Sequence, residues 1–184
     1  MTALRCTAKL LKAMKAAPAA QPAPTRNRLG EWTANLIRFS RIQLVVAVND
    51  ATRFGVVIDA APYAQIPLRL TERIFKALLS IGIPADLAAE EAEAMRPLEF
   101  AASNSKSVLG TLNQYAVDVD CGLSYGRGHS ATELSARLAD NIVLKPAHIG
   151  FPADRVREAF GLPPLDRRAR IIAETGKAKL YHFD

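Results

Sequence analysis

The chain has 184 residues, of which 49% are hydrophobic and 23% charged, with 24 Lys and Arg against 18 Asp and Glu. This length suits one domain, or one domain with a tail, and the composition excludes a disordered chain, a collagen-like repeat and a disulfide scaffold. The longest aliphatic run, from Leu44 to Val48, is far shorter than the ~20 residues of a membrane span. We therefore expect a cytoplasmic globular protein with no membrane partner.

The net charge of +6 belongs to the N-terminal segment. The first 30 residues contain no Asp or Glu, and they hold six of the 24 basic residues, leaving 18 to balance the 18 acidic residues of the rest. An electrostatic partner is therefore expected to contact the N-terminal segment first.

The N-terminal segment has two interpretations. It is basic and acid-free like a transit peptide, but residues 2–6 also fit a strand, with Thr7 as the N-cap of a helix to about Ala17. On that helix Leu10 and Leu11 share one face with Met14, which favours a helix that packs into the fold. Three lysines lie off this face and form a candidate basic patch for weak, non-specific binding of nucleic acid: Lys9, Lys12 and Lys15.

An Ala/Pro linker, residues 18–24, leads to the clearest β pattern of the chain. Apolar residues alternate over 32–39, 42–48 and 54–58, and only Ser40-Arg41 separates the first two runs. This spacing predicts an antiparallel meander with a tight hairpin. Its free edge strand would offer a site for a protein partner.

Helical patterns dominate the remainder. Helices are predicted at 70–81 with Thr71 as cap, at 85–95 and at 105–120, and a short strand at 98–101. Residues 122–128 are predicted as a loop, a capping box at 130–133 begins a helix that runs towards Pro146, and Pro152 begins another that ends near Phe160. We expect a single α+β domain over residues 1–164, a small, mainly antiparallel sheet packed by helices, with C-terminal helices and a basic tail at 165–184.

The segment 102–114 is the most informative for function, because a polar loop runs directly into a predicted helix. Free backbone N–H groups, hydroxyls and the positive end of the helix dipole can bind an anion at such a junction. Ordinary helix capping by Ser and Asn explains the same composition. Both interpretations stay open.

Three blocks carry a resemblance: Arg5-Cys6-Thr7 with Lys9-Leu10-Leu11, then Trp32-Thr33-Ala34-Asn35-Leu36, and finally 105–113. Together they resemble an uncharacterised family of small bacterial proteins, a domain of unknown function sometimes found on mobile elements. The resemblance covers roughly residues 3–120, and Gln114 stands where the family pattern has an acidic residue. It implies no reaction. Polar residues that interrupt these blocks and the loop before the last one form our candidate site: Arg5, Asn35, Asn104, Ser107 and Asn113.

Catalytic constellations are weakly indicated. Ser107 or Cys121 would serve as nucleophile with His129 as base, but no GxSxG elbow is present. The carboxylates of Asp118 and Asp120 would point about 200° apart on a helix, so they do not converge. A toxin-type ribonuclease would act through Arg5, Ser107 and His129, with Arg38 and Lys106 as further cations for phosphate.

Cysteine and histidine spacing predicts no structural metal, and no cofactor motif is found. Cys6 and Cys121 stand 115 positions apart, which is typical of two reduced thiols in a cytosolic protein. His129, His148 and His182 are scattered. The sequence favours a binding or regulatory module with a polar site at Asn104–Asn113, the alternative being a nucleic-acid-associated protein or ribonuclease, and does not decide whether the chain is an enzyme.

Overall fold

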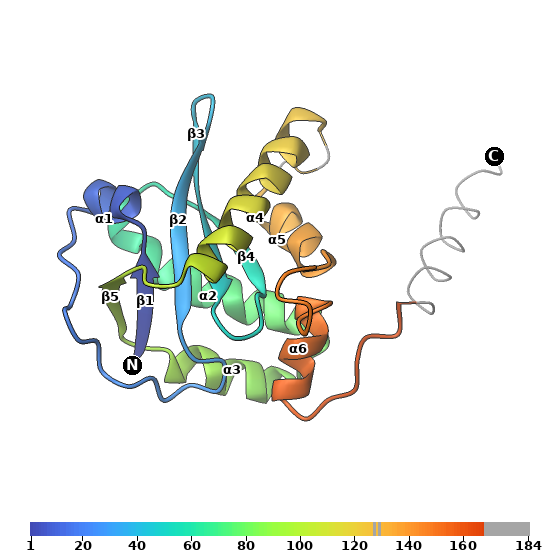
Figure 1. The fold of residues 1–184 in the computed structure, drawn as a ribbon. Helices are drawn as coiled ribbons and strands as arrows, with labels where there is room; N and C mark the ends of the chain where they lie inside the picture. The colour runs from blue at the N-terminus through green and yellow to red at the C-terminus, as the bar shows by residue number, and fades with distance from the viewer. Residues whose placement is uncertain (127, 129, 168–184) are drawn as a thin grey trace.

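The computed structural model describes residues 1–126, 128 and 130–167, and its centre is a five-stranded sheet with helices on both faces (Figure 1). The strand order is β4-β3-β2-β1-β5. The strands are β1 (Thr2–Cys6), β2 (Trp32–Phe39), β3 (Ile42–Asn49), β4 (Gly55–Asp59) and β5 (Leu98–Ala102). The predicted α+β class and the meander β2-β3-β4 are confirmed. The sheet is mixed, because β1 lies between β2 and β5 and is parallel to both.

Helices cover both faces of this sheet, and each face has its own core. One core joins the strands to α1 (Ala8–Met14), α2 (Ile66–Ser80), α3 (Ala85–Ala94) and α6 (Pro152–Ala159). The other joins them to α4 (Lys106–Ser124) and α5 (Ala131–Ala139). A short 3₁₀ turn, η1 (Tyr63–Gln65), precedes α2. None of the described helices is both long and apolar enough to span a membrane.

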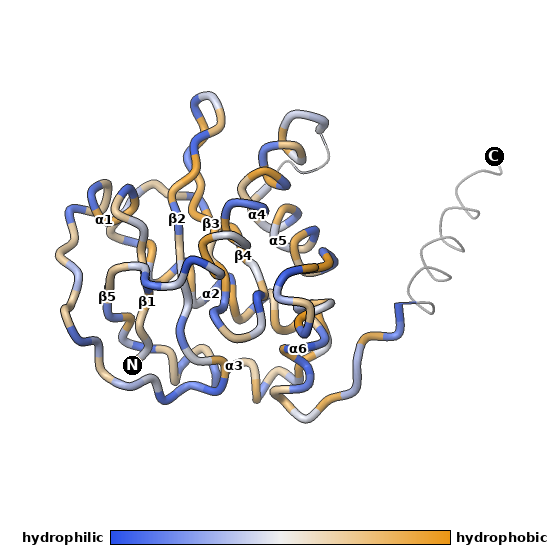
Figure 2. Tube along the Cα trace, in the orientation of Figure 1, coloured by the Kyte–Doolittle hydropathy of each residue, from blue (hydrophilic) through white to orange (hydrophobic). Residues whose placement is uncertain are grey.

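Successive side chains of each strand point alternately into the two cores. On β2, Trp32, Ala34 and Leu36 face the α1 and α2 side. On β3, Val46 and Val48 face α4 and α5, while Val45 and Ala47 face the opposite core. Because both of its faces are covered, β3 is hydrophobic over most of its length, as Figure 2 shows.

The N-terminal segment is part of the fold. Leu4 of β1 and Leu10 of α1 are fully buried, and the Thr7 side chain accepts a hydrogen bond from the Leu10 backbone N–H as the predicted N-cap. The helix ends at Met14, earlier than predicted, because Lys15 adopts a left-handed conformation with φ of 54°.

Other helix boundaries differ from the prediction. α2 begins at Ile66, where Pro67 suits its first turn, so Thr71 lies inside the helix and its hydroxyl donates to main-chain oxygens of the preceding turn. α4 continues through Ser124, so residues 122–124, predicted as loop, are helical.

Ser130 is the N-cap of α5, as predicted, and its hydroxyl accepts from the Glu133 N–H at 3.2 Å, but α5 ends at Ala139 instead of continuing towards Pro146. Beyond α5 the chain is extended, and Val143 bridges to Gly150. Of the basic tail, residues 168–184 lie outside the described part of the chain.

Both edges of the sheet are partly occupied by the chain itself. At β5, the Ala19 N–H donates to the Phe100 carbonyl over 2.7 Å, so the Ala/Pro linker runs along this edge. At β4, the Ser135 hydroxyl of α5 accepts from the Val57 N–H at 2.8 Å and contacts the Val57 carbonyl at 3.2 Å. The edge expected to receive a protein partner is therefore already covered at Val57.

Candidate functional site

A groove of about 830 Å³ runs between one side of α4 and the extended segment after α5. This volume lies within the range of small-molecule sites. Its walls combine two lysines, one carboxylate whose oxygens accept from Gln114 and Asn141, several neutral polar groups and apolar side chains: Lys106, Ser107, Gly110, Thr111, Gln114, Tyr115, Asp118, Asn141, Ile142, Val143, Leu144, Lys145 and Pro146. We call this the α4 groove.

The extended wall of the α4 groove is fixed at both of its ends. Asn141 donates from Nδ2 to Asp118 Oδ2 over 2.8 Å, and the Val143 N–H donates to the Gly150 carbonyl over 2.7 Å. Val143 points into the core, whereas Ile142 and Leu144 are 57% and 78% exposed. The alternation of an extended chain thus leaves two large apolar side chains uncovered at the groove.

The first turns of α4 form the opposite wall. Ser105 is the N-cap and accepts from the Val108 N–H at 3.3 Å, which makes Lys106 the first helical residue. The Ser107 hydroxyl oxygen accepts from Arg53 Nη2 at 3.1 Å. Thr111 is 6% exposed, and its Oγ1 has no hydrogen-bond partner among the described residues.

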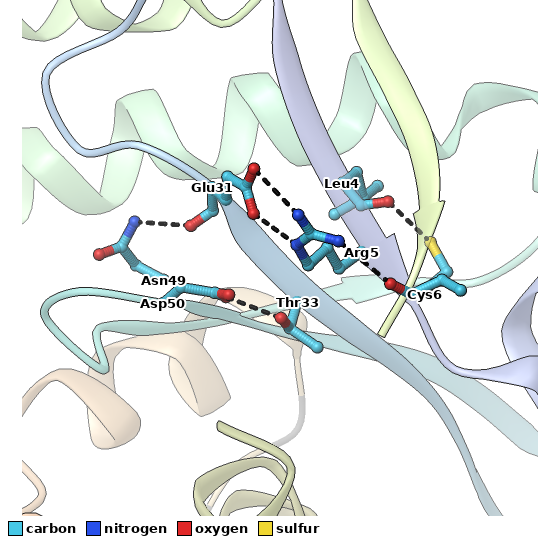
Figure 3. Close-up of polar contacts among 8 residues, drawn as sticks. Leu4, Arg5, Cys6, Glu31, Thr33, Asn49 and Asp50 are labelled. Atoms are coloured by element: carbon cyan, nitrogen blue, oxygen red, sulfur yellow. Dashed lines mark hydrogen bonds and ion pairs between the residues drawn. The ribbon is translucent and has the colours of Figure 1, made fainter. Parts of the chain in front are cut away.

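A set of charged side chains adjoins the groove at Ser107 and contains two arginines and two carboxylates: Arg5, Glu31, Asp50 and Arg53. We call this set the arginine–carboxylate network. Figure 3 shows Arg5 directed at Glu31, with Thr33 directed at Asp50. Arg5 Nη2 lies 3.2 Å from Glu31 Oε1, Arg5 Nε contacts Oε2, and the Thr33 hydroxyl donates to Asp50 over 2.7 Å.

Burial perturbs two members of this network. It raises the pKa of Asp50, an effect that nearby Glu31 increases and that the Thr33 hydrogen bond and Arg53 oppose. It also lowers the pKa of Arg53, against the attraction of Asp50. Asp50 therefore takes up a proton more readily than an exposed aspartate, while Arg53 remains cationic.

The five predicted site residues come from β1, β2, the loop before α4 and α4 itself, and they do not all face one space. Arg5 belongs to the arginine–carboxylate network, and the Asn35 Oδ1 accepts from the Thr7 hydroxyl at 2.8 Å. Asn104 is exposed in the loop before α4, and Ser107 lines the groove. Asn113 is exposed on α4 and, by helix geometry, projects about 120° away from Ser107.

The other predicted residues occupy separate places. Lys9, Lys12 and Lys15 are all exposed on α1 and at its C-cap. Asp118 lines the groove, held by Asn141 and by Gln114, while Asp120 is exposed.

The catalytic candidates gain no common geometry. Burial raises the pKa of the Cys6 thiol to about 12, whereas Cys121 is exposed, and both are free thiols. His129 lies outside the described residues. Over the described ranges, no group of three His, Cys, Asp or Glu side chains is placed to hold a metal ion.

Three residues of this region were not predicted from the sequence: Arg53, Asn141 and Lys145. The Asn49-Asp50 turn indicated a loop, but nothing local shows that Arg53, at φ of 61°, reaches Ser107. Lys145 and Asn141 were hidden because the helical periodicity after Ser130 was extended too far.

The model of one protein family, described as Domain of unknown function (DUF6933), matches residues 3–155. No curated protein and no solved structure matches the chain. The match extends beyond the three blocks through α4 and α5 to the start of α6, so it includes both walls of the α4 groove.

Proposed function

The chain belongs to the DUF6933 family of unknown function, and we propose that it is a binding protein whose ligand, a small organic anion with an apolar body, occupies the α4 groove. The observation that carries this proposal is the union, in one groove, of two lysines with uncovered apolar side chains. The proposal keeps only the part of the predicted polar junction that lines the groove, Lys106 and Ser107, as the anchor, and it sets the rest of the ligand along the segment 141–146.

The cationic part of the groove suits an anionic group. Lys106 and Lys145 are both exposed and both line it. Lys106 stands in the first turn of α4, a 19-residue helix whose unpaired N–H groups and dipole favour negative charge. The Thr111 hydroxyl, buried in the same wall without a partner among the described residues, adds an independent indication of a missing polar contact.

The apolar part suits a hydrocarbon or ring. Ile142 and Leu144 are exposed beside Pro146, and covering them would remove apolar surface from water. A protein partner is the competing occupant of the same surface. We propose the small molecule because a concave space of this size, walled on two sides, is typical of ligand sites.

A ribonuclease is less well supported. Its phosphate cation, Arg5, is engaged by Glu31 and by the Ala102 carbonyl at 3.3 Å. The hydroxyl oxygen of Ser107, its candidate nucleophile, already accepts a hydrogen bond from Arg53 at 3.1 Å. We also propose a bacterial, cytoplasmic protein associated with mobile elements, as the resemblance implies. The free thiols of Cys6 and Cys121 support a reducing compartment.

The proposal is tested by titrating isotope-labelled protein with octanoate and, in parallel, with the neutral octanol, while recording backbone amide NMR shifts. We expect saturable shifts for octanoate centred on Ser107, Gly110 and Leu144. The double variant Lys106→Ala/Lys145→Ala should weaken octanoate binding by about tenfold, equivalent to ~1.4 kcal/mol, and leave octanol unchanged.

A matched control is Lys9→Ala/Lys12→Ala, which removes the same charge from α1. If this control weakens octanoate equally, the effect is one of net charge, and the proposal fails. Octanoate shifts that are absent or centred elsewhere also contradict it. Broadening of groove resonances only when a co-purified protein is added would assign the surface to a protein partner instead.

A further inference from the structure

The paired ends of β2 and β3 project beyond α1 and α2, two of the helices that cover the sheet (Figure 1). Strand pairing continues as far as Phe39, which pairs with Ile42. The turn between them consists of Ser40 and Arg41, and Ser40 has a φ of 51°. Arg38, Arg41 and the turn residue Ser40 are exposed, and Ile42 is 45% exposed. The projecting element is therefore a two-stranded ribbon with an arginine at its turn and another beside it.

The basic helix α1 is fixed close to this ribbon. The Thr7 N–H donates to the Ala34 carbonyl at 3.1 Å, and the Thr7 hydroxyl donates to Asn35 at 2.8 Å. Asn35 precedes Arg38 by three residues on the same strand, a distance of roughly 10 Å in extended chain. The start of α1 and the base of the ribbon are thus neighbours.

The ribbon also presents Arg38 on the side of α1. Ala34 and Leu36 face the core that contains Leu10 and Leu11 of α1, and alternation places Arg38 next on that face. Its partner across the hairpin, Gln43, contacts the hydroxyl of Tyr63, which packs against the same core. Arg38 therefore lies on the face of the sheet that α1 covers.

Five cations make up this basic end: Lys9, Lys12, Lys15, Arg38 and Arg41. None of the five has an ion pair or side-chain hydrogen bond with another described residue. The carboxylates that flank the meander, Glu31 and Asp50, lie at the opposite ends of β2 and β3. Asp59, opposite Leu44, is the acid nearest the ribbon along the sheet.

We propose that the basic end is a binding surface for double-stranded DNA, with the ribbon in the major groove and the α1 lysines on the phosphate backbone. The major groove is about 12 Å wide and admits a two-stranded β-ribbon, whereas that of A-form RNA is too narrow for side chains to enter. Single strands are bound by stacking on exposed aromatic rings. Here Trp32 is fully buried and Phe39 is half-buried.

This surface is independent of the proposed function, because it uses no residue of the α4 groove. Contacts by five cations predict affinity that is insensitive to sequence and falls steeply with salt, since each neutralised phosphate releases counterions. Substituting two or three of these cations should reduce the salt slope by about one for each phosphate that is no longer neutralised.

The test measures fluorescence anisotropy of a labelled DNA duplex with the full chain, at several salt concentrations between about 50 and 200 mM. We expect binding that weakens with salt. Two variants, Lys9→Glu/Lys12→Glu/Lys15→Glu and Arg38→Glu/Arg41→Glu, should each weaken it by about tenfold or more at low salt, with a shallower salt slope. Circular dichroism verifies that both variants stay folded.

The control is Lys106→Glu/Lys145→Glu, a double charge reversal in the α4 groove, which should change the affinity less than about twofold. Equal weakening in the control means that net charge alone attracts DNA, and unchanged affinity in both test variants means that the basic end does not touch it. Each result overturns the proposal. So does tighter binding to single-stranded DNA, double-stranded RNA or phosphatidylserine vesicles than to the duplex.

Discussion

Single buried polar side chains fix the long segment that joins α1 to β2. Glu91 of α3 is 3% exposed and accepts three hydrogen bonds, from Asn27 Nδ2 at 2.8 Å and from the backbone N–H groups of Arg28 at 2.8 Å and Leu29 at 3.0 Å. These three donors belong to the turn that directs the chain into β2. The carboxylate of Glu91 thus fixes the turn that precedes β2, although α3 and β2 are far apart along the chain.

We predict that Glu91→Gln destabilises the protein by about 1–3 kcal/mol, because the amide turns a donor towards buried N–H groups that need an acceptor. Urea unfolding followed by circular dichroism measures the difference. The control is Glu93→Gln, two residues along the same helix, whose carboxylate pairs with Arg96 and whose side chain is 79% exposed. This control should change stability by less than about 0.5 kcal/mol, and equal effects of the two substitutions would contradict the structural role of Glu91.

Asp50 predicts a pH dependence of the opposite sign from that of a salt-bridged carboxylate. Burial raises its folded-state pKa, so the folded protein holds this proton more strongly than the unfolded chain. Its contribution to stability is therefore greatest below the unfolded pKa of about 3.9 and decreases as pH rises through the folded pKa. Asp50→Asn removes this decrease and keeps an oxygen to accept from Thr33.

We expect Asp50→Asn to unfold at a higher urea concentration than the original protein at neutral pH, and to show a weaker dependence on pH from about 3.9 upward. Urea midpoints measured across this pH range test it. Asp120→Asn, at an exposed position of α4, controls for the change in net charge. A lower midpoint for Asp50→Asn at neutral pH would show that attraction to Arg53 outweighs desolvation.

At the scale of elements, sequence patterns correctly predicted the strands, caps and helices that depend on interactions between residues close together in the chain. The meander, the Thr7 and Ser130 caps and the helix at Pro152 all follow from alternation or capping within a few residues. The parallel position of β1 between β2 and β5 was not predicted, because it depends on contacts between segments that are distant along the chain. The sequence of a five-residue strand does not indicate which strands it pairs with.

The candidate site divides in the same way. Ser107 and Lys106 were found because a polar loop before a helix is visible in sequence. Lys145 and Asn141 were not, since a helical pattern continues past Ala139, where the chain becomes extended to pair with Gly150. Arg53 reaches Ser107 from a turn that precedes it by 54 positions, and no spacing rule covers that distance.

The contact between Tyr115 of α4 and the first residue of β4 depends on a glycine. A Cβ at Gly55 would lie 2.5 Å from Cε2 of Tyr115, a buried ring whose hydroxyl donates to the Arg53 carbonyl over 2.9 Å. We predict that Gly55→Ala lowers stability by about 1–3 kcal/mol, because the new Cβ would force a buried ring to shift from its packed position. Thermal unfolding measures it.

The matched substitution is Gly110→Ala on the exposed side of α4, where a new Cβ meets no atom within 4 Å. Here alanine should raise stability by about 0.5–1 kcal/mol, because glycine is a poor residue inside a helix. Equal destabilisation at both positions would mean that the loss is not specific to the contact between Gly55 and Tyr115, and would contradict the prediction.

For the whole molecule, the position of β1 changes the meaning of the net charge of +6. The acid-free first 30 residues are not an appended basic arm, because they contain an interior strand of the sheet and a helix on its face. Their lysines are displayed by a rigid scaffold. The charge of this segment can therefore be removed without disturbing the fold only by substituting the lysines, and not by deleting the segment.

We predict that deletion of residues 1–17 abolishes cooperative unfolding, whereas Lys9→Glu/Lys12→Glu/Lys15→Glu leaves the unfolding midpoint nearly unchanged. The deletion removes Leu4 and Leu10, both fully buried, and takes from β2 and β5 the strand that each pairs with. The three substitutions touch only exposed side chains without ion pairs to described residues, where changes stay within about 0.5 kcal/mol. Thermal scans of both proteins by circular dichroism test this prediction. If the truncated chain still unfolds cooperatively at the original temperature, β1 is dispensable for folding. A decrease in DNA binding on truncation could then be assigned to the loss of charge alone.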